Sequence, residues 1–253
     1  MTLFIPQNKN DMPPGPSRTC ILGEPGVGKT RLAATFPDPF FLDLENGAGS
    51  TNQPRLHIPP SPKATALVLA EINKLATFKP NPNGALLHPA GFPINTLVID
   101  SIDAIQEFEK YFGVLKGRSK MQIQDWDTLY NVVFPVVLAW SALPIHVVVV
   151  AHVRQEEGED NKPGVKTFAL QGSFKDRMPR WFDYILHLVA GPDGKRFVIS
   201  QPMIAKGYQY KAKDRHNSLA SLANNNIIEL PANEDGYPSP QIATVIVGAH
   251  KNG

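Results

Sequence analysis

The chain contains the sequence GEPGVGKT at residues 23–30. This stretch matches the pattern G-x-x-x-x-G-K-[ST], in which glycines allow consecutive backbone N–H groups to turn inward around a phosphate. The pattern assigns Lys29 to the β- and γ-phosphate oxygens and the Thr30 hydroxyl to Mg²⁺. An apolar run at 19–22 precedes the motif and a helix-like segment at 31–36 follows it, which is the strand–loop–helix order that the motif requires.

The motif therefore predicts a nucleoside triphosphate site, with ATP and Mg²⁺ as the expected ligands. The predicted contacts are consecutive residues of the motif together with the first residue after it: Gly23, Glu24, Pro25, Gly26, Val27, Gly28, Lys29, Thr30 and Arg31.

Composition places the chain among globular α/β proteins of modest size. It has 253 residues, of which 42% are hydrophobic and 19% charged, enough for a substantial core. The net charge of +2 is too small to indicate nucleic acid by itself. With a single cysteine, Cys20, and no long apolar stretch or secretion signal, we expect a soluble protein of the cytoplasm.

Strand-like and helix-like segments alternate along the chain. We predict a flexible arm at 1–17 and a single domain at 18–253, with a mainly parallel sheet between helices and an antiparallel hairpin extension near the C-terminus. A polar stretch at 154–172 shows no clear period and is predicted to be a long loop. The expected strands are 19–22, 39–45, 96–100, 145–151, 184–189, 196–200 and 208–212, the last two paired as the hairpin.

Polar residues follow three of the predicted parallel strands. Ligands of such sheets bind at the carboxyl ends of the strands, where side chains from different strands converge. Asp100 ends a buried strand and is our candidate Mg²⁺ ligand, acting with Thr30. Glu45 is our candidate general base, with Asp43 as the competing residue. His152 is expected to contact a γ-phosphate oxygen.

Basic residues gather in two further places. The loop at 116–120 carries Lys116, Arg118 and Lys120, and the segment 211–215 reads as a cationic hairpin tip containing Lys213 and Arg215. Arginine and lysine near a γ-phosphate stabilise the charge of the transition state, from the same subunit or from a neighbour.

Together these motifs resemble the RecA/RadA-like recombination and helicase ATPases, and most closely the compact single-domain phage members associated with single-strand annealing. The resemblance covers residues 18 to about 215. It rests on the phosphate loop, 41–45, 97–101, 149–152 and Lys213-Asp214-Arg215. Bacterial recombinases typically carry Gln where this chain has His152, so the sensing chemistry departs from the family pattern.

The resemblance implies roles for several of these residues. The strand-two glutamate activates water in that family, which supports Glu45 over Asp43. A Lys-x-Arg at a hairpin tip reaches the neighbouring subunit's nucleotide in related ring helicases, which implies that Lys213 and Arg215 act in trans within a homo-oligomer. Family members bind single-stranded DNA through two loops, which correspond here to Lys116, Arg118 and Lys120 and to a second loop containing Arg154, Lys166 and Lys175.

We therefore predict a RecA-like ATPase that acts on single-stranded DNA in recombination, repair or replication, with a single-strand-binding protein as a further partner. Phe168 and Phe174 are expected to stack on bases. Two alternatives stay open: a ring helicase or helicase-loading motor, and an ATP-switched oligomeric binding module without a DNA role. The sequence leaves open whether the oligomer is a ring or a filament.

Overall fold

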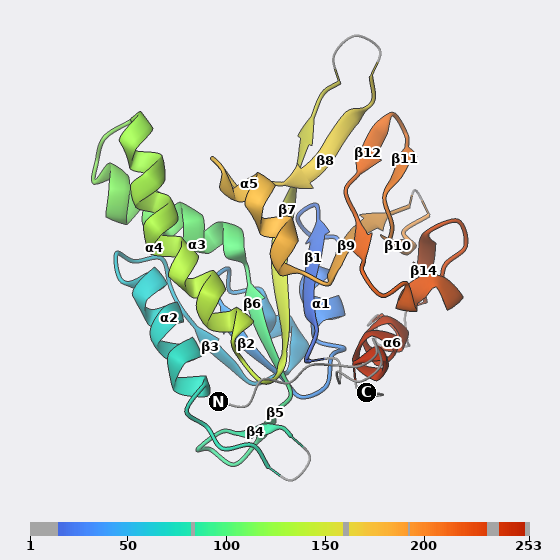
Figure 1. Cartoon of the computed structure of the whole chain (residues 1–253), viewed down its shortest axis with the longest axis horizontal. Coiled ribbons are helices and arrows are strands. Elements are labelled where there is room, and N and C mark those ends of the chain that lie inside the picture. The colour runs from blue at the N-terminus through green and yellow to red at the C-terminus, as the bar shows by residue number, and fades with distance from the viewer. Residues whose placement is uncertain (1–14, 82–83, 159–161, 192, 232–237, 251–253) are drawn as a thin grey trace, which may run out of the picture.

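A computed structural model describes residues 15–81, 84–158, 162–191, 193–231 and 238–250. Its centre is a twisted sheet whose parallel strands run in the spatial order β3-β2-β6-β7-β1-β9 (Figure 1). The predicted α/β fold with a mainly parallel sheet is confirmed. These strands are β1 (Arg18–Gly23), β2 (Pro39–Asp43), β3 (Arg55–His57), β6 (Thr96–Asp100), β7 (His146–Glu156) and β9 (Tyr184–Ala190).

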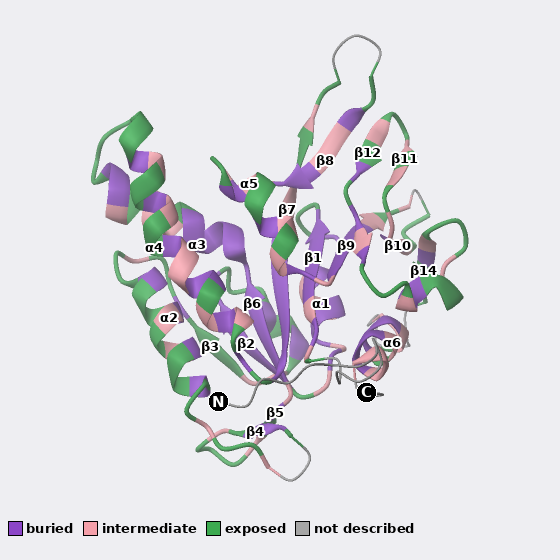
Figure 2. Cartoon of the chain, in the orientation of Figure 1, coloured by how far each residue is buried: buried purple, intermediate pink, exposed green. Residues whose placement is uncertain are grey.

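Side chains alternate between the two faces of this sheet and build two separate cores. Cys20, Leu42 and Val149 face one core, while Ile21, Phe41 and Val148 face the other. Both faces of a parallel sheet are covered by crossover helices, so its strands are continuous apolar runs. Figure 2 shows this burial along the central strands.

Helices cover both faces. The first core packs under α2 (Ala64–Leu75), α3 (Ile102–Phe108) and α4 (Ile123–Ser141), with the π-helical turn η2 (Glu109–Leu115) between the last two. The second core packs under α1 (Lys29–Ala33) and α6 (Gln241–Ala249). Shorter elements connect these layers: η1 (Ala48–Thr51), β4 (Leu86–Leu87), β5 (Pro93–Ile94), α5 (Phe174–Arg177), η3 (Met178–Trp181) and η4 (Ser218–Ser221). No helix in these described ranges combines the length and apolar character needed to cross a lipid bilayer.

Antiparallel strands extend the sheet, but with other partners than the sequence suggested. The predicted hairpin between 196–200 and 208–212 is wrong: β10 (Arg196–Ile199) pairs with β9 and β14 (Ile227–Leu230). The strand β12 (Tyr208–Tyr210) pairs instead with β11 (Met203–Ala205) and β8 (Gly164–Phe168). Strand pairing between distant segments depends on register and burial, which the sequence pattern of each segment does not show.

The predicted loop at 154–172 is mostly a β-arm. Strand β7 continues beyond the sheet through Glu156, and Val153–Glu156 pairs antiparallel with β8. Arg154 and Gln155 of the arm are exposed and Lys166 is partly exposed, whereas Thr167 is buried, so the polar residues follow no apolar period. The arm stands on the side at which the parallel strands end (Figure 1).

Of the expected arm at 1–17, only residues 15–17 belong to the described part of the chain. Ser17 is fully buried, and its backbone N–H donates to Nδ1 of His146 at 3.1 Å. Ser17, the last residue of the expected arm, is therefore packed against the start of β7.

Candidate functional site: a phosphate loop and the strand ends around it

The motif at 23–30 forms a tight turn between β1 and α1. Gly26 and Gly28 have φ angles of 75° and 104°, a region that residues with a Cβ seldom adopt. A Cβ on Gly23 would lie 2.8 Å from the carbonyl oxygen of Leu188, so the loop needs glycine there for its close approach to β9. The geometry is that of a phosphate cradle at the start of a helix.

Lys29 points back into this cradle. Its Nζ donates to the carbonyl oxygens of Gly23 and Glu24, at 3.0 Å each, and the residue is buried. Burial lowers the pKa of Lys29, while the negative charges of Glu45 and Asp100 act in the opposite direction. A phosphate in the cradle offers oxygen acceptors of greater charge to the same ammonium group.

Thr30 and Asp100 meet beside the cradle. The Thr30 hydroxyl donates to Oδ2 of Asp100 at 2.7 Å, although the two residues are 70 positions apart. Burial raises the pKa of Asp100 to about 6, against the opposing effect of the Thr30 hydrogen bond. A cation would stabilise the ionised form of this carboxylate, so the pair fits a hard ion such as Mg²⁺. Bound there, Mg²⁺ would neutralise charge on the β- and γ-phosphates.

The described residues offer no cluster of three or more His, Cys, Asp or Glu side chains for a metal. Thr30 and Asp100, which lie together on the cavity wall, are the residues that would hold the expected Mg²⁺, with phosphate oxygens and water completing its shell.

Glu45 and His152 face each other across the neighbouring strand ends. Nδ1 of His152 lies 3.6 Å from Oε1 of Glu45 and 3.4 Å from Oδ2 of Asp103. The Ser101 hydroxyl also donates to Glu45. The hydrogen bond to Asp103 is the main cause of a raised pKa at His152, against partial desolvation. His152 thus lies between Glu45 and Asp103, on the wall of the cavity that contains the phosphate loop.

Asp43, the competing base, has a different environment. It is fully buried and accepts the backbone N–H groups of Gly47 and Ala48 at 3.1 and 3.3 Å. Arg55 lies 3.6 Å from its Oδ2. Asp43 therefore shapes the turn after β2, whereas Glu45 lines the cavity next to the cradle.

That cavity has a volume of about 460 Å³, and it brings the candidate residues together. Glu45, Asp100 and His152 line it with the phosphate loop, as the strand-end argument predicts. The convergence of these three residues is an observation; their catalytic roles stay predictions.

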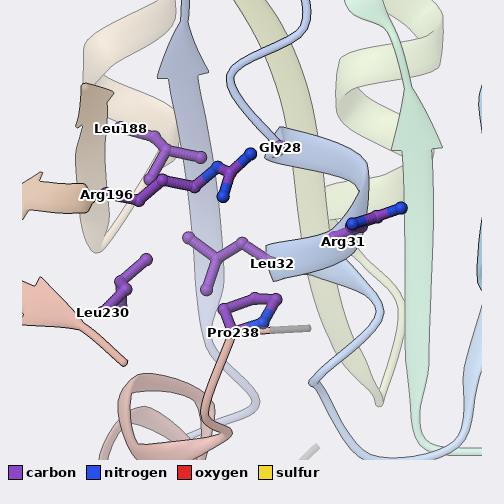
Figure 3. Close-up of a pocket in the computed structure, with 7 residues that line it drawn as sticks. All are labelled: Gly28, Arg31, Leu32, Leu188, Arg196, Leu230 and Pro238. Atoms are coloured by element: carbon purple, nitrogen blue, oxygen red, sulfur yellow. The ribbon is translucent and has the colours of Figure 1, made fainter. Parts of the chain in front are cut away.

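Arg196 also lines this cavity, and sequence reasoning missed it. Its Nε donates to the carbonyl oxygen of Val27 at 2.8 Å, and a Cβ on Gly28 would lie 3.1 Å from the same nitrogen. Figure 3 shows the Arg196 side chain reaching toward Gly28 just below Leu188, while Arg31 points away from it. Arg196 begins an antiparallel strand with no motif around it, so only strand pairing reveals its place.

Asp103 and Ser101 were likewise not predicted as site residues. Both lie at the start of α3, where Ser101 caps the helix by accepting the Ala104 N–H at 3.3 Å. Asp103 Oδ2 accepts the backbone N–H of His152 at 2.7 Å. The pattern D-S-x-D after a buried strand is the signal that could have indicated them.

Lys213 and Arg215 lie away from this site. The turn of the β11–β12 hairpin is at Lys206 and Gly207. The prediction that Lys213 and Arg215 occupy a hairpin tip is therefore wrong. The strand β13 (Lys213–Asp214) pairs with the beginning of β9. It lies where the parallel strands start, at the end of the sheet opposite the phosphate loop. Their action on a neighbour's nucleotide concerns an assembly of copies and stays a prediction.

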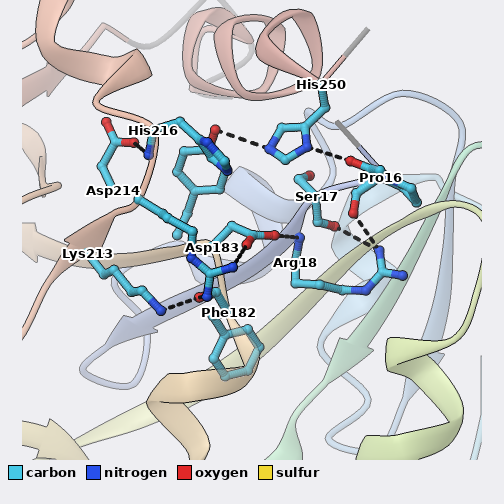
Figure 4. Close-up of polar contacts among 12 residues, drawn as sticks. Pro16, Ser17, Arg18, Phe182, Asp183, Lys213, Asp214, His216 and His250 are labelled. Atoms are coloured by element: carbon cyan, nitrogen blue, oxygen red, sulfur yellow. Dashed lines mark hydrogen bonds and ion pairs between the residues drawn. The ribbon is translucent and has the colours of Figure 1, made fainter. Parts of the chain in front are cut away.

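Contacts within the chain engage both cations. Lys213 Nζ donates to the carbonyls of Pro179 and Phe182, and Nη1 of Arg215 lies 2.7 Å from Oδ1 of Asp183 (Figure 4). Asp183 in turn accepts the backbone N–H of Arg18 at 3.0 Å. These hydrogen bonds and this ion pair hold the segment after β12 against the start of β9.

The predicted DNA-contacting cations occupy two projections on the side of the sheet that carries the phosphate loop (Figure 1). One is the turn before α4, with Lys116, Arg118 and Lys120; the other comprises the β-arm and α5, with Arg154, Lys166 and Lys175. Several of them are paired with carboxylates: Arg118–Asp125 at 3.0 Å, Arg154–Glu156 at 3.8 Å, Lys166–Glu24 at 3.0 Å and Lys175–Glu156 at 2.9 Å.

The two phenylalanines expected to stack on bases do not face solvent. Phe168 and Phe174 are buried in the first core. The prediction of base stacking by these residues is wrong, because Phe168 at the end of β8 and Phe174 at the start of α5 both pack into the first core.

The fold and the cradle define a phosphate-loop NTPase. A family model described as an AAA domain matches residues 16–216, which is most of the chain. The chain therefore belongs to this family of phosphate-loop ATPases, and the predicted ATPase class is confirmed. No curated protein matches the chain.

Proposed function

We propose that this ATPase is RecA-like in mechanism and that it couples Mg-ATP hydrolysis to binding of single-stranded DNA in recombination, repair or replication. In this proposal Glu45 orients the attacking water and His152 contacts the γ-phosphate, while Lys29, Thr30 and Asp100 stabilise the phosphates and the metal. The active form is a homo-oligomer with ATP at the subunit interface.

The observation that carries the proposal is the path of β7. This strand places His152 beside Glu45 and then continues directly into Val153–Glu156 of the arm. A displacement of His152 toward a γ-phosphate therefore acts on the arm through one continuous strand.

A second contact supports the same coupling. Lys166 on β8 lies 3.0 Å from Oε1 of Glu24, a residue of the phosphate loop itself. The arm is thus connected with the nucleotide site at both of its strands, which is the physical continuity that coupling between two sites uses.

The test is the ATPase rate without DNA, with single-stranded DNA and with duplex DNA, across a range of salt concentrations. We expect stimulation by single-stranded DNA that falls as salt rises, because phosphate contacts release counterions. A rate that does not respond to either DNA removes the recombination role and favours the ATP-switched module. Unwinding of a forked duplex would favour the helicase alternative.

Arm and turn variants sharpen this test. Arg154→Ala and Lys120→Ala should each weaken binding of single-stranded DNA and lower the salt slope by about 1. Lys63→Ala is the matched control, since Lys63 is exposed at the start of α2, outside both projections. Equal salt slopes in all three variants would remove these cations from the DNA interface.

A further inference from the structure

A second cavity, of about 630 Å³, lies behind the phosphate loop. Its walls are loop residues 23–27, strands β9 and β10, and the β11–β12 hairpin, elements that lie next to each other in Figure 1. It shares Pro25 and Gly26 with the cavity that contains Lys29 and Asp100, but none of the candidate catalytic residues. A volume of this size is typical of small-molecule sites.

His187 lines this cavity, and one of its ring nitrogens is buried and lacks a hydrogen-bond partner in the described part of the chain. His187 on β9 is 1% exposed, and its Nε2 has no partner among the described residues. A backbone hydrogen bond with Lys211 engages the ring through its other nitrogen. Burial lowers the pKa of His187 to about 4, so the ring is neutral near pH 7 and Nε2 is an acceptor. A buried acceptor of this kind requires a donor.

The other groups that line the cavity restrict the chemical class of the ligand that carries this donor. Tyr210 packs edge-on against His187, with ring centroids 5.4 Å apart, and Phe197 and Ile199 add apolar surface. The exposed Lys206 supplies positive charge, whereas the charge of Lys166 is paired with Glu24, which also lines the cavity. An aliphatic chain would leave Nε2 unpaired, and a carboxylate or phosphate would bring acceptor against acceptor. The buried end of the ligand is therefore a neutral ring with an N–H or O–H group, and its outer end is an anion.

We infer that this cavity binds a nucleobase with its attached phosphate, the base donating to His187 and the phosphate meeting Lys206. This chemistry has two sources: a free nucleotide, or one residue of a single strand. The second source rests on the proposed function, whereas the first does not. Because the ligand would contact loop residues 23–27, its binding is coupled to that of ATP.

The first experiment is calorimetric titration of dAMP and of a short thymidine oligonucleotide into the wild-type protein saturated with magnesium pyrophosphate. Pyrophosphate occupies the phosphate loop and carries no base, so additional binding that depends on His187 reports the second cavity. We expect His187→Leu to weaken binding about tenfold, the effect of losing one buried hydrogen bond. His187→Gln, which keeps an acceptor, should recover most of the affinity.

A variant on the surface gives a second test in case substitution of His187 prevents folding. Lys206→Glu lies in an exposed turn and should weaken binding in a way that depends on salt, while Lys63→Glu should have no effect. If both His187→Leu and Lys206→Glu weaken the binding of dAMP, a free nucleotide is a ligand of this cavity. Binding of the oligonucleotide alone, with the same response, identifies a strand.

Absence of binding by both probes, or binding that neither His187→Leu nor Lys206→Glu changes, would overturn the inference. The outcome is separable from that of the proposed function. If DNA fails to stimulate the ATPase while dAMP still binds in a His187-dependent manner, the DNA role falls and the cavity assignment stands.

Discussion

Arg196 and Val27 join the antiparallel extension to the phosphate loop: Nε of Arg196 donates to the Val27 carbonyl at 2.8 Å across 169 positions of sequence. The guanidinium thus lines the phosphate cavity from the side opposite Glu45 and His152. Arg196 therefore contacts the loop directly and lines the same cavity as Lys29 and Thr30.

The first prediction concerns this residue. Arg196→Gln should raise the dissociation constant for ATP about tenfold or more, since it removes a charged donor near the phosphates. Lys195→Gln is the control, because Lys195 is exposed and pairs with Glu229 at 2.7 Å, away from the cavity. Unchanged ATP affinity with a lowered melting temperature would show that Arg196 only supports the loop.

Glu45→Gln should bind ATP normally and hydrolyse it about 10²–10⁴ times more slowly, the usual contribution of a general base. Asp43→Asn should instead lower the free energy of unfolding by ~1–3 kcal/mol, because two backbone N–H groups and Arg55 depend on the buried carboxylate. Rapid single-turnover assays and denaturant titrations separate the two effects. Wild-type turnover in Glu45→Gln would transfer the role to Asp43 or to a water network.

Asp103 should control the protonation of His152. Because its hydrogen bond raises the pKa of His152, Asp103→Asn should return this pKa toward or below 6.5. In the wild type the associated stabilisation is complete below pH 6.5 and is lost as pH rises through the folded-state pKa; the variant should lack it. NMR titration of His152 measures the shift, with Glu107→Gln on the exposed side of α3 as control. An unshifted titration would mean that Asp103 only accepts the His152 backbone N–H.

His187 should make stability depend on pH in the opposite direction. Its pKa is lowered to about 4 in the folded protein, below the unfolded value of about 6.5, so the unfolded state binds more protons between these limits. The free energy of unfolding should therefore fall by about 3 kcal/mol as pH drops from 6.5 to 4. His187→Gln should remove this component. Urea titrations of both proteins across this range test it; parallel curves would contradict a neutral buried His187.

The trans role of Lys213 and Arg215 has a direct test in mixed oligomers. Mixing Lys29→Ala and Arg215→Ala subunits should restore part of the ATPase activity, because one interface then combines an intact loop with an intact arginine. The control is each variant alone. No recovery in a confirmed mixed oligomer, together with a lower melting temperature of Arg215→Ala, would limit Arg215 to its ion pair with Asp183.

The parts of the site that could be predicted are those with local causes. Residues 23–30 are contiguous, and their glycine positions and helix start dictate the cradle without reference to the rest of the chain. Asp100, Glu45 and His152 follow strands of apolar residues, and parallel strands end at one edge of a sheet, so their convergence also followed from the sequence.

Tertiary structure alone decided the rest, because it depends on which distant segments pair. The register of β10 against β9 brings Arg196 to the phosphate loop, and the antiparallel pairing of β7 with β8 turns a polar stretch into an arm. The pairing of β13 with the beginning of β9 places Lys213 at the end of the sheet opposite the phosphate loop, away from the tip that the sequence suggested. By itself, then, the sequence determined a phosphate-loop ATPase with its strand-end carboxylates. Long-range strand pairing, whose energy comes from burial and register and is not visible in any single segment, decided what surrounds them.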